Sequence, residues 1–279
     1  MKKNNKKLKI KWYNLSLLIS LLVIILIFLF STFNIYDWLI DSKNIKNKQT
    51  EVLKDAIITE KSDNENTEII NNQKDLSKNN EYWSYIKQNL LDVDFTKLKK
   101  KNSDVKGWIK VNGTNVNYPY VQTVDNDFYL NHSIDKSSNK AGWIFMDYRN
   151  DNNFNDKNTI LYAHNRKDKT MFGSLKNVLT KNWLKNKNNF TINISTEKEN
   201  SLWQIFSVYH IETTNDYIQV YFTNDDEFLK FSNKLIDRSV HNFNSSISKD
   251  DKILTLSTCY KENEKLVVHA KLIKKEIKQ

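Results

Sequence analysis

The residue of this sequence best suited to nucleophilic catalysis is its one cysteine, Cys259. Apolar and polar residues alternate in the run before it, as expected for a β-strand. Leu254 and Leu256 therefore face one side, and Thr255, Ser257 and Cys259 face the other. A thiolate at a strand end can attack a substrate carbonyl. The pattern predicts a thiol nucleophile, with a small buried side chain as the alternative.

The cation that the local pattern brings closest to this thiol is Lys265. Apolar residues alternate from Leu266 to Leu272 and leave Lys265 on the opposite face. The loop 260–264 is short enough for an antiparallel hairpin, in which cross-strand neighbours lie roughly 5 Å apart. The hairpin predicts an ammonium group beside the thiol, with a solvated lysine at a sheet edge as the alternative.

A cysteine nucleophile needs a base or an imidazolium partner, and the chain has five histidines. His164 directly follows the strand-like run 159–163 and opens a polar loop, a position suited to a mobile catalytic base. The others lie in polar segments or along predicted strands: His132, His210, His241 and His269. Spacing alone leaves the choice among them open.

Composition excludes several other chemistries. One cysteine rules out an intramolecular disulfide framework and any CxxC zinc site. The four glycines have neither the spacing of a GxGxxG loop nor that of a P-loop. Six lysines within residues 1–11 supply six of the ten excess positive charges, which leaves about +4 for the remainder of the chain. A nucleic-acid-binding domain is therefore not predicted.

The segment 12–36 has no charged residue and is predicted to be a transmembrane anchor. A hydrocarbon core of roughly 30 Å needs about 20 apolar residues, and aromatic residues bracket this run at both ends. A cleaved signal peptide is the alternative, but the run does not end in a small-x-small site. A buried core helix does not suit a segment flanked by six lysines. The positive-inside rule places residues 1–11 in the cytoplasm and everything after Tyr36 outside.

The rest of the chain divides by composition. Residues 37–80 are predicted to be a polar stalk or linker, with a charged helix over 45–61 and a solvated spacer over 62–79. Residues 81–279 are predicted to be the outer domain, which begins with a short helix over 82–91. Two more helices are expected, at 169–178 and 226–240. The predicted strands are 108–111, 114–118, 143–146, 159–163, 190–194, 202–210, 218–222, 253–257 and 265–273. Many short strands with few helices indicate a closed or nearly closed β-barrel.

Three motifs together resemble a known family. YAHN at 162–165, TMFGSL at 170–175 and TLSTC at 255–259 resemble the sortases, most closely the class B sortases of Gram-positive bacteria. NYPYVQ at 117–122 and FMDYRN at 145–150 look like other stretches of that class. The resemblance covers residues 95–273. It implies a closed eight-stranded β-barrel with short peripheral helices, preceded by an N-terminal membrane helix.

The resemblance also implies a function, cysteine transpeptidation. Cys259 would attack the carbonyl after a Thr in the C-terminal sorting signal of a surface protein, and His164 would move protons. Ser257 and Thr258 would contact the substrate. A peptidoglycan or lipid-linked precursor amine would accept the acyl group. This cycle needs no metal or organic cofactor.

The sequence departs from the family at the start of the last strand, where the family has an arginine and this chain has Lys265. Lysine keeps the charge but loses the planar bidentate fork. Arg166, two residues after His164, is a second candidate cation. Three interpretations remain open: an active membrane-anchored sortase, a degenerate relative that binds sorting signals with little turnover, and a surface cysteine hydrolase.

Overall fold

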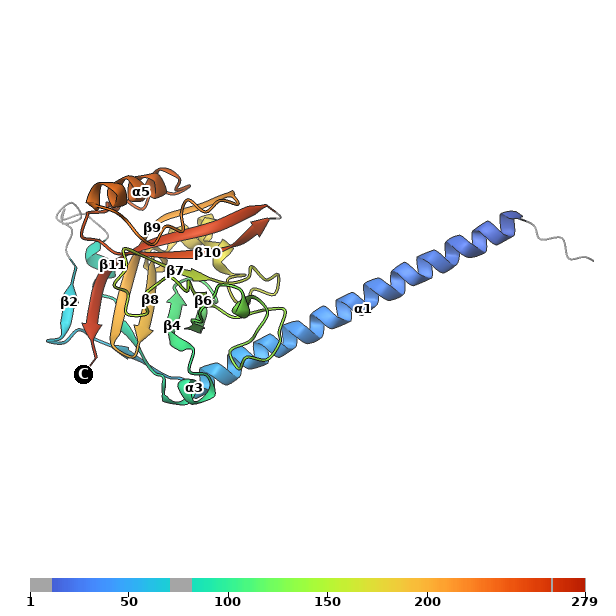
Figure 1. The fold of residues 1–279 in the computed structure, drawn as a ribbon, viewed down its shortest axis with the longest axis horizontal. Helices are drawn as coiled ribbons and strands as arrows, with labels where there is room; N and C mark the ends of the chain where they lie inside the picture. The colour runs from blue at the N-terminus through green and yellow to red at the C-terminus, as the bar shows by residue number, and fades with distance from the viewer. Residues whose placement is uncertain (1–11, 71–81, 262, 279) are drawn as a thin grey trace, which may run out of the picture. The chain divides into compact units, whose positions relative to one another are not determined.

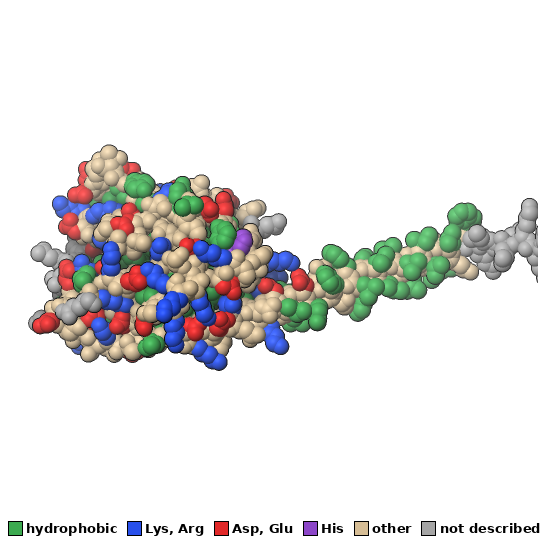
Figure 2. Space-filling model, turned by 60° about the horizontal axis from the view of Figure 1, so that its bottom comes forward, with side chains coloured by type: hydrophobic (Ala, Val, Ile, Leu, Met, Phe, Trp, Pro, Cys, Tyr) green, Lys and Arg blue, Asp and Glu red, His purple; other side chains and the backbone are tan. Residues whose placement is uncertain are grey.

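The computed structural model describes residues 12–70, 82–261 and 263–278, so the predicted cytoplasmic tail 1–11 and the boundary at 80–81 lie outside the described residues. The chain forms two compact units, Met1–Asn44 and Ile45–Gln279. Helix α1 (Trp12–Asp55) contains the apolar segment, and it is long and apolar enough to cross a membrane. In Figure 2, apolar side chains cover the exposed part of this helix.

Eight strands of the second unit close into a barrel (Figure 1). Neighbours pair in the order β10–β7–β6–β5–β4–β8–β9–β11, and β11 pairs again with β10. The predicted closed eight-stranded barrel is confirmed. The strands are β4 (Val105–Val111), β5 (Asn117–Val121), β6 (Phe145–Met146), β7 (Asn158–Tyr162), β8 (Thr191–Thr196), β9 (Glu199–Glu212), β10 (Ile253–Lys261) and β11 (Glu264–Ile277).

Apolar side chains fill the barrel and also cover part of its outer face. Trp108, Trp143 and Trp203 are fully buried, and each large buried side chain contributes roughly 1.5–3 kcal/mol. Outside the barrel, α5 (Asp225–Asp237) packs Phe228 and other apolar residues onto β9, β10 and β11. Both faces of β10 are therefore buried up to Thr258, and only its end is exposed.

The predicted stalk is more structured than its composition indicated. Strand β1 (Ile57–Lys61) pairs with β3 (Leu90–Asp94), and β2 (Thr67–Ile69) pairs with β11. Strand β2 has its backbone partner in the barrel, whereas β1 and β3 form a separate two-stranded sheet. The predicted helix at 45–61 accordingly ends at Asp55, where α1 ends.

A buried lysine of β11 attaches the segment before β3 to the barrel. The side chain of Lys274 is 1% exposed. Its ammonium donates to Asp63 Oδ1 at 2.6 Å and to the carbonyls of Ile86 and Gln88 at 2.7 and 2.6 Å. All three donors of the ammonium are used, which offsets the cost of burying the charge.

The remaining helices are short. They are α2 (Tyr82–Tyr85), α3 (Thr96–Lys101), α4 (Lys181–Lys185) and the 3₁₀ helices η2 (Phe128–Leu130), η3 (Leu175–Leu179) and η4 (Lys187–Asn189). The helix predicted over 82–91 covers only Tyr82–Tyr85, because Leu90 and Leu91 belong to β3. Two further predictions, over 169–178 and 218–222, were wrong. The helix predicted over 169–178 is a turn followed by η3, because Lys169 and Met171 have positive φ, which an α-helix does not allow. The strand predicted over 218–222 does not form. Side chains, not a neighbouring strand, bind the carbonyls of Ile218 and Gln219.

Candidate active site

The hairpin of β10 and β11 places the thiol beside a cation. Cys259 and Lys265 are register partners next to the turn of the hairpin. The Lys265 Nζ donates to the Cys259 Sγ at 3.3 Å, and the cysteine is exposed to solvent. The structure therefore brings these two side chains together, in the arrangement that strand parity predicted.

The parallel pairing of β10 with β7 brings His164 to the same edge. Ser257 is the register partner of Tyr162, and the Ala163 N–H donates to the Ser257 carbonyl at 3.4 Å. Continued by two residues, this register sets His164 opposite Cys259. Because the carboxyl ends of parallel strands meet at one edge, two motifs far apart in the sequence share one site.

A backbone carbonyl orients the His164 ring. His164 Nε2 lies 2.8 Å from the carbonyl oxygen of Leu130 in η2. A carbonyl only accepts hydrogen bonds, so Nε2 carries a proton in this arrangement. In the neutral ring Nδ1 is then the nitrogen without a proton, and the described residues give it no hydrogen-bond partner.

These residues line one groove with a volume of about 580 Å³. Cys259, His164 and Lys265 contribute to it, as do Ser257 and Thr258. One wall comes from the segment before and within η2, through Asn126, Asp127 and Leu130. Another comes from the loop 213–218 after β9, through Thr213, Thr214, Asn215, Tyr217 and Ile218. A groove of this size suits an extended peptide segment.

Ser257 and Thr258 line the groove but already have internal hydrogen bonds. The Ser257 Oγ lies 2.9 Å from the hydroxyl of Tyr217, and the Thr258 Oγ1 donates to the Ala163 carbonyl at 2.7 Å. Burial raises the pKa of Tyr217, which keeps its hydroxyl protonated. Thr258 thus attaches the end of β10 to the residue before His164.

All three arginines are in ion pairs with aspartates. Arg166 binds Asp168, with a 2.8 Å distance between Nη2 and Oδ2, and also lies within hydrogen-bond distance of Thr170. The other pairs are Arg149–Asp147 and Arg238–Asp216. None of the three lines the groove, whereas Lys265 does. Within the described residues, Lys265 is the lysine or arginine that contacts the thiol.

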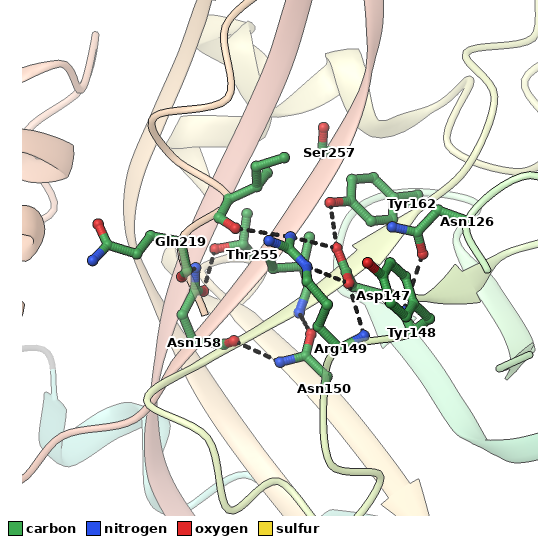
Figure 3. A network of polar contacts seen from close by, with 12 residues as sticks. Asn126, Asp147, Tyr148, Arg149, Asn150, Asn158, Tyr162, Gln219, Thr255 and Ser257 are labelled. Atoms are coloured by element: carbon green, nitrogen blue, oxygen red, sulfur yellow. Dashed lines mark hydrogen bonds and ion pairs between the residues drawn. The ribbon is translucent and has the colours of Figure 1, made fainter. Parts of the chain in front are cut away.

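A polar network behind the groove was not predicted from the sequence (Figure 3). Asp147 is fully buried and accepts hydrogen bonds from Arg149 and from the hydroxyl of Tyr162. Burial alone would raise the pKa of Asp147, but the Arg149 and Tyr162 hydrogen bonds outweigh burial and hold that pKa below its usual value. The FMDYRN stretch was noted for its resemblance only. An aspartate two residues before an arginine was the available signal.

Comparisons with known proteins agree on one family. A family model described as the sortase domain matches residues 109–273. Sortase B of Listeria monocytogenes is 38% identical over 182 residues, which cover 64% of this chain and 73% of the relative.

Two solved structures are similar in fold. The crystal structure of sortase B from Bacillus anthracis in complex with AAEK1 has a TM-score of 0.66 and 31% identity, and the match covers 85% of this chain and 99% of that chain. The Staphylococcus aureus sortase B–substrate complex has a TM-score of 0.60 and 37% identity, over 64% of this chain and 84% of that chain.

Proposed function

The chain belongs to the class B sortases, which are cysteine transpeptidases, and from that premise we propose how its own residues carry out the reaction. Cys259 is the nucleophile, His164 the general acid and base, and Lys265 the cation that stabilises negative charge. The substrate is a surface protein with a C-terminal sorting signal that is cleaved after Thr. The observation that carries this proposal is the thiol with an ammonium 3.3 Å away in a groove that His164 also lines.

The first half-reaction forms a thioester. The Cys259 thiolate attacks the carbonyl carbon of the scissile Thr, and the carbonyl oxygen becomes an oxyanion. The Lys265 ammonium is near enough to the sulfur to donate to that oxyanion. When the C–N bond breaks, protonated His164 gives its proton to the leaving amine.

The second half-reaction transfers the acyl group to an amine. The amine of a peptidoglycan or lipid-linked precursor attacks the thioester, His164 takes a proton from it, and the thiolate leaves. Because the Leu130 carbonyl accepts from Nε2, we assign these proton transfers to Nδ1. Ser257 and Thr258 are proposed substrate contacts at the base of the groove. The S. aureus relative was solved as a substrate complex, which supports a sorting signal as the ligand of this groove.

The same proposal includes the location of the enzyme. Helix α1 anchors the protein in the cell membrane through residues 12–36, with the N-terminus in the cytoplasm and the catalytic unit on the outer face. The length and apolar composition of α1 support this assignment.

Mass spectrometry of intact protein tests the chemistry. The unit Ile45–Gln279 is incubated with a library of sorting-signal peptides, with and without an amine acceptor such as triglycine. We expect an adduct of the acyl mass on Cys259, its conversion to an amide product when the amine is present, and no adduct in Cys259→Ala.

Other outcomes would favour the alternatives. Release of free acid at the same rate with and without the amine would indicate a cysteine hydrolase. Peptide binding without any adduct would indicate a degenerate relative that binds sorting signals.

A further inference from the structure

We infer that Arg149 is a positioning residue that holds one wall of the groove, residues 213–218, at a fixed distance from β7. Its effect on peptide binding rests on the proposed function, whereas its effect on the wall does not. Arg149 does not line the groove and takes no part in the transpeptidation steps.

The first contact of Arg149 is with the barrel. Its Nε donates to Asp147 Oδ1 at 2.9 Å, and its Nη2 donates to Asp147 Oδ2 at 2.8 Å. The Asp147 carboxylate also accepts the Tyr162 hydroxyl at 2.9 Å. Tyr162 is the last residue of β7 and lines the groove. Through Asp147, the guanidinium is therefore attached to the wall that contains His164.

The second contact is with the opposite wall. The Nη2 of Arg149 donates to the Ile218 carbonyl at 3.0 Å, and both Ile218 and Tyr217 line the groove. The Tyr221 hydroxyl donates back to the Arg149 carbonyl at 3.1 Å. One side chain thus joins the two walls. Figure 3 shows the first of its contacts, the network of Arg149, Asp147 and Tyr162.

The wall depends on such contacts because residues 217–222 have no strand partner. Side chains from several elements hold the loop instead. Asn158 Nδ2 donates to the Gln219 carbonyl at 2.8 Å, and Arg238 binds Asp216. Arg149 differs from Asn158, the first residue of β7, because through Asp147 it reaches the last residue of that strand, Tyr162, which lines the groove. Its loss would free the wall beside Tyr162, while Asn158 still holds Gln219 at the other end of β7.

Arginine is required for this arrangement by geometry. Its planar fork presents Nε and Nη2 to one carboxylate while a further N–H of Nη2 reaches the Ile218 carbonyl. A lysine keeps the positive charge near buried Asp147, but its single nitrogen on a flexible stem cannot reproduce three donors in one plane. Arg149→Lys therefore keeps a positive charge beside Asp147 but removes the contact that positions the wall.

Hydrogen exchange tests the wall independently of catalysis. In the unit Ile45–Gln279, Arg149→Lys should raise amide exchange in the peptide covering 213–222 by about tenfold, which corresponds to about 1.4 kcal/mol. Exchange in the barrel strands should stay at the native rate. Arg166→Lys is the matched control, because Arg166 also pairs with an aspartate two residues away and does not line the groove. Native exchange at 213–222 in Arg149→Lys would overturn the inference, whatever the enzyme does.

Kinetics test the consequence for binding. Arg149→Lys should raise KM for a sorting-signal peptide about tenfold, with kcat within threefold of native. The rate at which iodoacetamide alkylates Cys259 should be unchanged, because that small reagent does not need the wall.

The results distinguish failure of the role in binding from failure of the proposed function. A native KM together with faster exchange would refute the role in substrate binding. If the native protein itself forms no thioester, the proposed function fails, and the exchange measurement still decides whether Arg149 holds the wall.

Discussion

Among single residues, Lys265 is where this site differs from a site with an arginine beside the cysteine. Its ammonium lies 3.3 Å from the Cys259 sulfur, whereas each of the chain's arginines is paired with an aspartate and does not line the groove. A lysine has a single nitrogen, which must donate first to the sulfur and then to the oxyanion. A guanidinium has several nitrogens in one plane and can donate to both at once. We therefore expect catalysis that depends on one flexible side chain.

Replacing Lys265 measures that dependence. Lys265→Met keeps the volume of the stem and removes the charge, so kcat should fall by roughly 10²–10³, the usual effect of losing one oxyanion donor. Lys265→Arg should match or exceed the native rate. Steady-state kinetics with a sorting-signal peptide provide the measurement, and unfolding midpoints serve as the control for the fold. Normal turnover in Lys265→Met would remove Lys265 from the mechanism.

His269 has a structural role that predicts a pH dependence of stability. It is fully buried, with Nε2 2.9 Å from the Tyr209 hydroxyl and Nδ1 2.9 Å from Thr255 Oγ1. Burial, with a smaller effect of Arg238, lowers its pKa to about 3. In an unfolded chain the ordinary value is about 6.5.

The sign of this effect follows from proton counts. Between pH 6.5 and 3 the unfolded chain binds a proton at His269 and the folded chain does not, so stability falls as the pH falls. One proton corresponds to a slope of about 1.4 kcal/mol per pH unit. In urea unfolding across this range, the slope of unfolding free energy against pH should be smaller in His269→Gln by about 1.4 kcal/mol per pH unit, the contribution of one proton. An identical slope in both proteins would mean that His269 is protonated in the folded chain.

At the level of elements, local patterns predicted the hairpin but not what packs around it. Alternation in β10 and β11 was enough to place Cys259 beside Lys265, because hairpin register depends on nearby residues. The roles of these residues remain proposals. The segment 218–222 in the loop after β9 was predicted as a strand from its apolar residues, yet Ile218 and Phe222 pack against the apolar cluster under α5 instead. No local pattern distinguishes an apolar loop under a helix from a strand.

The strands before residue 70 show the same limit and provide a prediction. Their partners lie far along the chain: β3 pairs with β1 at separations of 29 to 37 residues, and β11 pairs with β2 at separations of 205 to 209. A protein that starts at Tyr82 loses Asp63 from the buried Lys274 ammonium and Asn64 from buried Glu276. Compared with one that starts at Ile45, its free energy of unfolding should fall by about 3 kcal/mol or more.

A substitution in the shorter protein separates the two causes of its lower stability, the unpaired buried charge and the lost strands. In the protein that starts at Tyr82, Lys274→Met should recover part of the stability, because it removes an ammonium that has lost its carboxylate partner. Urea unfolding of the three proteins provides the comparison. Equal stability of the two native-sequence proteins would show that residues 45–81 are a passive spacer, as their composition first indicated.

For the molecule as a whole, the distribution of charge favours a membrane anchor over a nucleic-acid partner. Lysine, arginine, aspartate and glutamate side chains are interspersed on the face of the barrel unit seen in Figure 2. Many form ion pairs, such as Lys136–Asp104 and Lys275–Glu68. The excess positive charge lies mainly in residues 1–11, before the apolar segment.

This arrangement predicts a topology. Protease added to intact protoplasts should degrade the chain beyond Tyr36, because the positive-inside rule retains the lysines in the cytoplasm. Immunoblotting with antibodies to the barrel unit provides the measurement, and a cytoplasmic protein serves as the control for intact membranes. Protection of the barrel unit, or a mature N-terminus after Phe33, would contradict the anchor.

The parallel contact between β7 and β10 also has a consequence for folding kinetics. The Thr258–Ala163 hydrogen bond joins residues 95 apart in the sequence, and the barrel closes only when β11 pairs with both β9 and β10. Contacts of such long sequence separation form late and slowly. During synthesis, His164 leaves the ribosome well before Cys259, and Cys259 lacks its Lys265 partner until the last strand of the barrel is made. The nascent enzyme therefore remains inert, and its activity should return in refolding with the same rate constant as barrel closure.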